Sequence, residues 1–271
     1  MKPTFETKMS VSSEFLGCLM YNFIATGVLS STAVLTFGEL LAPRLVVLSL
    51  GAGFGYLTGL FTSTSGGYLN PAVTASLMAL YPLNKGNMSP LKGLMNMLAQ
   101  LIGTAVGIAL VVRFLLFFCA LERRQLTRNA QIAIVPDADK SNENLGVPAL
   151  TYGTSSGSGF AIEALGAFFI TWIVLANEAY TLAGPRSTST PIALGTAMTS
   201  LQLFAFPFTT ACFNPVRALC LFLFSGTSGS DLITFVSAPF LGSLVATGLY
   251  LVAFTNSSVL QTASSKSTKA L

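Results

Sequence analysis

The chain has 271 residues, of which 52% are hydrophobic and 9% are charged, and its mean hydropathy is +0.69. Because about a quarter of the residues of a soluble domain are charged, this composition excludes a soluble protein and indicates an integral membrane protein with about six spanning helices. The formal net charge of +4 comes mostly from loops and tails, so it gives no reason to expect a nucleic-acid partner.

Six apolar stretches predict the spanning helices. They lie at residues 14–37, 45–61, 94–119, 160–180, 190–206 and 232–254. The first stretch is too long for the apolar part of a cleavable signal peptide, so we expect it to remain in the membrane. Residues 120–158 form the longest polar connection, and a loop of this length is typical of a lid, a partner surface or a partly disordered segment.

Two shorter apolar segments each begin with Asn-Pro, one from Asn70 to Leu80 and one from Asn214 to Phe224. Asn is a favoured N-cap and Pro a favoured first helical residue, so both segments predict helix starts. A helix of about 11 residues rises roughly 16 Å, which is about half of the ~30 Å hydrocarbon core of a bilayer. The sequence therefore predicts two half-length helices whose polar caps lie inside the membrane.

The two halves of the chain repeat each other. Residues 14–17 (Glu-Phe-Leu-Gly) match residues 163–166 (Glu-Ala-Leu-Gly), and the two Asn-Pro boxes correspond at a similar offset. Each unit contains three spanning helices and one half-helix. Since three is an odd number, the second unit must enter the membrane from the opposite face, so the repeat is inverted. We therefore predict an all-α membrane protein with six transmembrane helices and two re-entrant half-helices whose N-termini meet.

These features resemble the aquaporin, or major intrinsic protein, family over about residues 12–255. The resemblance rests on the paired Asn-Pro boxes, the Glu near the start of the first and fourth spans, and the Arg three residues after the second Asn. It implies a cytoplasmic N-terminal tail (1–13), a channel domain (14–255) and a cytoplasmic C-terminal tail (256–271). Within the channel domain, repeats 14–119 and 159–255 flank the connecting loop 120–158. The resemblance also implies a homotetramer in the plasma membrane or an internal membrane, conducting water and small neutral solutes.

The Asn-Pro boxes are the candidate pore residues: Asn70, Pro71 and Ala72 in the first repeat, and Asn214, Pro215 and Val216 in the second. Helix N-termini carry partial positive charge, so two that face each other would repel cations. We expect both Asn side chains to point an amide N–H into the pore. A passing water that accepts both bonds would no longer relay protons along the file.

Register with the family places the selectivity constriction at Leu50, Gln202, Ala211 and Arg217. A charged side chain in a spanning region is costly unless it lines water or has partners, so Arg217 is either a pore residue or part of a structural salt bridge. Strict water channels usually have an aromatic ring and a histidine where this chain has Leu50 and Gln202, which favours a wider opening. Glycerol channels usually have Asp after the arginine, whereas this chain has Ala218. Water-only conduction and conduction of glycerol or urea both remain open.

Two acids, Glu14 and Glu163, lie within predicted spans, and the resemblance implies that they support the half-helix loops through backbone N–H groups. The chain has no histidine, and its four cysteines lack ligand spacing, so we expect no enzyme activity, cofactor or metal site. Passive conduction of water, with exclusion of protons and ions, is the first hypothesis. The alternatives are an ion-coupled small-solute transporter that uses one of the two acids, and a membrane adhesion or scaffold protein with vestigial transport.

Overall fold

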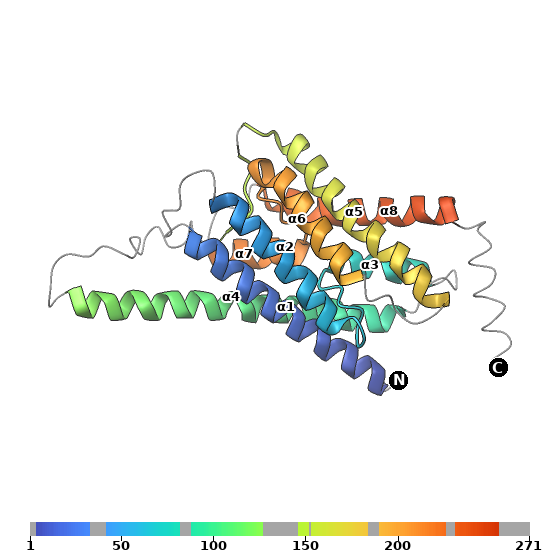
Figure 1. The fold of residues 1–271 in the computed structure, drawn as a ribbon, viewed down its shortest axis with the longest axis horizontal. Coiled ribbons are helices and arrows are strands. Elements are labelled where there is room, and N and C mark those ends of the chain that lie inside the picture. The colour runs from blue at the N-terminus through green and yellow to red at the C-terminus, as the bar shows by residue number, and fades with distance from the viewer. Residues whose placement is uncertain are drawn as a thin grey trace.

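The computed structural model describes residues 4–32, 42–81, 88–126, 146–151, 153–183, 190–225 and 231–254. Within these ranges the fold is all-α, with the two shortest helices, α3 and α7, lying among the longer ones (Figure 1). The helices in chain order are α1 (Phe5–Thr32), α2 (Ala42–Phe61), α3 (Pro71–Leu80), α4 (Pro90–Leu126), α5 (Ser156–Ala183), α6 (Thr190–Thr209), α7 (Pro215–Ser225) and α8 (Leu232–Phe254). The predicted fold class, six long helices and two half-length ones, is confirmed.

The long helices bury polar side chains and expose apolar ones. On α1, for example, Glu14 and Asn22 are fully buried, whereas Leu16 and Phe23 are 46% and 42% exposed. A soluble protein has the opposite distribution, and an apolar surface with a polar interior suits a lipid environment. The chain is therefore a multi-pass membrane protein.

Four of the described helices, α4, α5, α6 and α8, contain an apolar window long enough to cross a bilayer. The 28-residue helix α1 is long enough but carries Ser, Asn, Thr and Glu on its buried face. The described apolar part of α2, Leu45–Phe61, is shorter. Hydropathy alone therefore identifies fewer spans than the fold contains, because the inward face of α1 is polar.

Two predicted boundaries need correction. Helix α1 begins at Phe5, so most of the polar stretch assigned to an N-terminal tail is helical. Two of its serines, Ser10 and Ser13, are buried, and the Ser10 hydroxyl donates to Asn96 Oδ1 at 3.3 Å. Helix α4 continues to Leu126, so the predicted loop begins later than residue 120. Residues 127–145, which make up about half of that loop, and the tail 256–271 lie outside the described residues.

The helix contacts show the inverted repeat directly. Helix α1 packs on α4 as α5 packs on α8, α1 on α2 as α5 on α6, and α3 on α8 as α7 on α4. Exchanging the two halves leaves this set of contacts unchanged, as expected for a pseudo-two-fold axis. In Figure 1, α1 begins and α8 ends at the same end of the bundle.

Equivalent glycines make the same close approach in both halves. A Cβ on Gly103 of α4 would meet the Phe15 carbonyl oxygen, and one on Gly242 of α8 would meet the Ala164 carbonyl oxygen. Phe15 and Ala164 differ by the same 149 residues as Glu14 and Glu163. Helices α1 and α4, and likewise α5 and α8, therefore pack through glycine at corresponding positions.

Candidate functional site

Each half-helix begins at an asparagine that caps it. Asn70 has an extended backbone (φ −149°, ψ 118°), and its side-chain oxygen accepts from the Ala72 N–H at 3.0 Å. Asn214 Oδ1 accepts from the Val216 N–H at 3.2 Å and the Arg217 N–H at 3.4 Å. Both oxygens therefore satisfy backbone donors that a helix N-terminus otherwise leaves unpaired.

The same two side chains tie the half-helices together. Asn70 Nδ2 donates to the Phe213 carbonyl, and Asn214 Nδ2 donates to the Leu69 carbonyl, both at 2.9 Å. Each amide therefore donates one N–H to the opposite half of the molecule. An amide nitrogen carries two hydrogens, so one N–H of each asparagine remains.

The segments that lead into the half-helices have left-handed backbone at corresponding positions. Leu69 and Phe213, one residue before each asparagine, both have φ 52°. The first repeat places Gly66 and Gly67 in this region, where the second has Thr210 (φ 59°) and Ala211 (φ 52°). Because a left-handed conformation costs a non-glycine residue roughly 1–2 kcal/mol, other contacts must hold the second segment.

Glu14 supplies such contacts in the first repeat. Its side chain is fully buried and accepts four hydrogen bonds. The donors are Ser65 Oγ (2.6 Å) and Tyr68 N (3.1 Å) to Oε1, and Leu69 N (2.8 Å) and Gln100 Nε2 (2.7 Å) to Oε2. Glu14 thus joins α1 to the segment before α3 and to α4.

Glu163 occupies the equivalent place in the second repeat, and it is also fully buried. Its carboxylate accepts from Cys212 N at 3.1 Å and from Phe213 N at 2.7 Å. Both acids therefore hold backbone N–H groups next to a capping asparagine.

Arg217 lies one turn into α7 and is only 5% exposed. Its Nη1 donates to Asn22 Oδ1 at 2.8 Å and to Thr26 Oγ1 at 3.4 Å, both on α1. The guanidinium carbon lies 6.0 Å from the centre of the Tyr21 ring. Nη2 is buried without a hydrogen-bond partner in the described part of the chain. Because its partners are neutral, the salt-bridge alternative has no support here.

The other three constriction residues are also buried: Leu50, Gln202 and Ala211 are 2–4% exposed. Leu50 and Ala211 belong to the same apolar cluster as Tyr21. Among the described residues, Gln202 Oε1 has no hydrogen-bond partner. Tyr21 therefore lies beside Arg217 and in the same apolar cluster as Leu50 and Ala211.

Three residues of this site, Tyr21, Asn22 and Thr26, were not predicted from the sequence. A signal for two of them exists, because Glu14, Cys18, Asn22 and Thr26 follow one another every four residues. Residues four apart lie on one face of a helix, so this spacing puts a polar stripe along an apolar span. Such a stripe must face the protein interior or water.

The three cysteines whose side chains the structure describes show no ligand arrangement. Cys18, Cys212 and Cys220 are buried and unpaired, and Cys212 Sγ donates to the Asn214 carbonyl at 3.5 Å. In the described part of the chain, no group of three or more His, Cys, Asp or Glu side chains could hold a metal ion.

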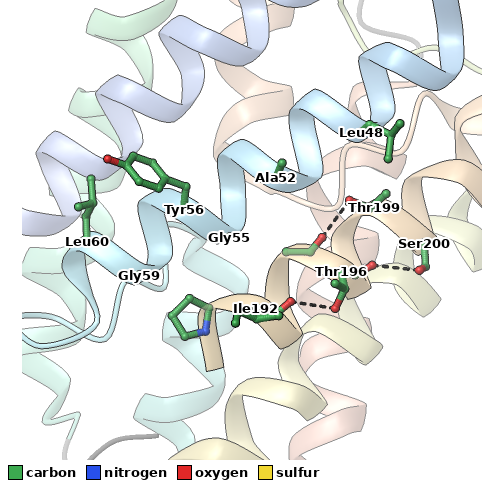
Figure 2. A pocket seen from close by; sticks show the side chains of 12 residues that line it. Leu48, Ala52, Gly55, Tyr56, Gly59, Leu60, Ile192, Thr196, Thr199 and Ser200 are labelled. Atoms are coloured by element: carbon green, nitrogen blue, oxygen red, sulfur yellow. Dashed lines mark hydrogen bonds between the residues drawn. The ribbon is translucent and has the colours of Figure 1, made fainter. Parts of the chain in front are cut away.

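A groove of about 640 Å³ between α2 and α6 lies apart from this site (Figure 2). Its lining includes Gly55, Tyr56, Gly195, Thr196, Thr199 and Ser200. The hydroxyls of the last three donate to backbone carbonyls of α6 itself. The groove therefore offers a largely apolar wall and includes none of the capping or constriction residues.

Three comparisons with known proteins agree with this arrangement. The model of the family described as major intrinsic protein matches residues 2–250. A probable aquaporin TIP2-2 from Oryza sativa subsp. japonica is 28% identical over 243 residues, covering 88% of this chain and 82% of that protein. Aquaporin-1 from Ovis aries is 26% identical over 266 residues, covering 92% and 85%. The structure of an aquaglyceroporin from Plasmodium falciparum aligns with a TM-score of 0.70 at 19% identity, covering 90% of this chain and 95% of that one.

Proposed function

The chain belongs to the major intrinsic protein family, and from that premise we propose that it is a passive transmembrane channel for water and small uncharged solutes. The observation that supports this proposal best is the reciprocal pair of hydrogen bonds from Asn70 to Phe213 and from Asn214 to Leu69. These bonds bring the N-termini of two half-helices together inside a membrane protein. Membrane proteins form solute sites at the ends of such discontinuous helices, and each asparagine here keeps a second N–H for a solute.

We propose that this joint excludes cations and interrupts proton transfer. Each helix N-terminus carries roughly half a positive charge, and the two face each other here. Each capping asparagine keeps one N–H after its bond to the opposite half. A water that accepts from both asparagines would be fixed in orientation and would not pass on a proton.

The constriction would select solutes by hydrogen bonding and charge. Among the described residues, Arg217 has no acidic partner and an unpartnered donor at Nη2, whereas Gln202 has an unpartnered acceptor at Oε1. A solute that both accepts and donates hydrogen bonds would satisfy the two groups. Water does so, and so do glycerol and urea. Because Leu50 stands in place of a rigid aromatic ring, we propose that glycerol and urea pass in addition to water.

The geometry gives the alternatives no support. An ion-coupled transporter needs an acid that is free to bind the ion, but the carboxylates of Glu14 and Glu163 are occupied by protein donors. A scaffold role would rest on the 120–158 loop, about half of which lies outside the described residues. We therefore also propose that the protein is not an enzyme and needs no cofactor.

Proteoliposomes test the proposed channel. Vesicles that contain the protein should shrink in an osmotic gradient much faster than empty vesicles, should admit glycerol or urea, and should carry no ion current. Replacing Arg217 with alanine should change the selectivity among solutes, whereas a protein with vestigial transport would not respond. Shrinking no faster than that of empty vesicles would rule the proposal out, as would uptake that depends on a proton or sodium gradient.

We propose further that the chain forms a homotetramer in the lipid bilayer, as the family resemblance implies. The protein mass in a detergent micelle, measured by light scattering with correction for bound detergent, tests the assembly directly. A mass near one chain of 28.4 kDa would contradict it.

A further inference from the structure

We propose that Asn22 is a positioning residue for selectivity: it fixes the guanidinium of Arg217 without neutralising its charge. This inference rests on the proposed channel function and extends it to a residue outside the Asn-Pro boxes and the four expected constriction positions. Asn22 lies on α1, 195 residues away from Arg217 in the sequence.

The Asn22 side chain uses both of its polar atoms, and it is fully buried. Its Nδ2 donates to the Cys18 carbonyl at 2.9 Å and to Thr104 Oγ1 at 3.0 Å. Its Oδ1 accepts from Arg217 Nη1 at 2.8 Å. A carbonyl can only accept and a guanidinium can only donate, so these partners define which end of the amide faces the arginine.

This arrangement decides which part of Arg217 is available. Nη1 is held by Asn22 and Thr26, whereas Nη2 has no partner in the described part of the chain. A charge-assisted hydrogen bond fixes the direction of the planar group, so the free nitrogen is fixed as well. An acid in place of Asn22 would hold Arg217 equally well but cancel its charge, and an apolar residue would leave it unanchored.

The second half of the molecule provides an internal comparison. At the position equivalent to Asn22, offset by 149 residues, α5 has Thr171, whose hydroxyl donates to Ser243 Oγ at 2.8 Å. The position in α3 equivalent to Arg217, offset by 144 residues, is Val73. A hydroxyl is therefore enough to join two helices where no arginine is present. The amide occurs on α1, which also holds the arginine of the other half.

Two substitutions of Asn22 test separately the position of the Arg217 guanidinium and its charge. Asn22→Leu removes the acceptor of Nη1 but keeps the charge of Arg217. We therefore expect the glycerol-to-water permeability ratio to change by about tenfold, the effect of losing one charge-assisted hydrogen bond, while cations remain excluded. Asn22→Asp keeps an acceptor for Nη1 but offsets the charge, and it puts a second oxygen against the Cys18 carbonyl. We therefore expect lower stability and, in the protein that assembles, a nearly unchanged ratio and a measurable cation current. Thr171→Val is the matched control, because it breaks an equivalent buried pair that has no arginine partner, and it should change neither readout.

Each outcome of these measurements either supports or overturns the positioning role of Asn22. Equal changes of the permeability ratio in Asn22→Leu and Thr171→Val would show a merely structural role and overturn the inference. If Asn22→Leu fails to assemble, Asn22→Asp is the only test that remains. A cation current with an unchanged glycerol-to-water permeability ratio supports the inference, and cation exclusion as in the wild type overturns it. Wild-type vesicles that shrink no faster than empty ones would instead overturn the proposed function, and this inference with it.

Discussion

Glu163 and Asn70 lie at opposite ends of one hydrogen-bonded chain that passes through Phe213. The Phe213 N–H donates to Glu163 Oε2 at 2.7 Å, and its carbonyl accepts from Asn70 Nδ2 at 2.9 Å. Glu14, Leu69 and Asn214 form the same chain in the other direction. The acid of each half therefore sets the position of the half-helix cap of the other half.

The two acids should not be equally sensitive to replacement. Glu14→Gln and Glu163→Gln each replace one acceptor oxygen by an NH2 group that faces backbone donors. We expect both to lower the free energy of unfolding by about 1–3 kcal/mol, with the larger effect at Glu14, which accepts bonds from Ser65 and Gln100 besides two backbone groups. Thermal unfolding in detergent measures which of the two variants loses more stability. A larger loss at Glu163 would contradict this account.

The capping asparagines should tolerate aspartate poorly. Asn70→Asp keeps the acceptor for the Ala72 N–H but puts a second oxygen against the Phe213 carbonyl, and it adds a negative charge between two helix N-termini. We expect lower stability together with a cation current in proteoliposomes. Asn96→Asp is the control, because Asn96 is equally buried but bonds to Ser10. Equal cation currents in Asn70→Asp and Asn96→Asp would contradict the role proposed for Asn70.

Local sequence rules were sufficient to predict where the half-helices begin. Asn before Pro predicts an N-cap and a first helical residue, and the structure has Asn70 as the cap of α3 and Pro71 as its first residue. The inverted repeat also followed from the sequence, because an odd number of spans in each unit fixes its orientation. These features depend on neighbouring residues and on chain topology, both of which are visible in the sequence.

Contacts between distant residues could not be predicted in the same way. The bond from Arg217 to Asn22 depends on how α7 packs beside α1, and no local pattern specifies that packing. The start of α1 was misplaced for a related reason. Ser10 and Ser13 look like tail residues by composition, but their hydroxyls bond to Asn96 and Thr64 inside the bundle.

The segment before α3 should depend on Gly67. This residue has φ 63°, and an added Cβ would lie 2.6 Å from the Thr58 carbonyl oxygen. We expect Gly67→Ala to lower the free energy of unfolding by about 1–3 kcal/mol, since left-handed backbone and a clash both penalise it. Gly53→Ala on α2 is the control: nothing lies within 4 Å of its added Cβ, so it should leave stability unchanged or raise it by about 1 kcal/mol. Equal losses for the two alanine variants would contradict the special role of Gly67.

Gln202 should matter for conduction and not for folding. Its Oε1 has no partner in the described part of the chain although the side chain is only 3% exposed, so the protein gains little stability from that atom. Replacing an unsatisfied buried polar atom by an apolar group of similar size is nearly neutral or stabilising. We therefore expect Gln202→Leu to keep the unfolding midpoint of the wild type. The same substitution removes the acceptor that a solute would use beside Arg217, so glycerol and urea permeability should fall more than water permeability.

Gln100→Leu is the matched control for this last substitution. Gln100 is also buried and also has an unpartnered Oε1, but its Nε2 donates to Glu14 at 2.7 Å and to Thr74 at 2.9 Å. Losing the bond to a carboxylate should cost about 1.5–3 kcal/mol, so Gln100→Leu should unfold at a lower temperature. If Gln202→Leu instead destabilised the protein as much as Gln100→Leu and left the ratio of glycerol to water permeability unchanged, Gln202 would be a packing residue. The unpartnered oxygen would then have no part in solute selection.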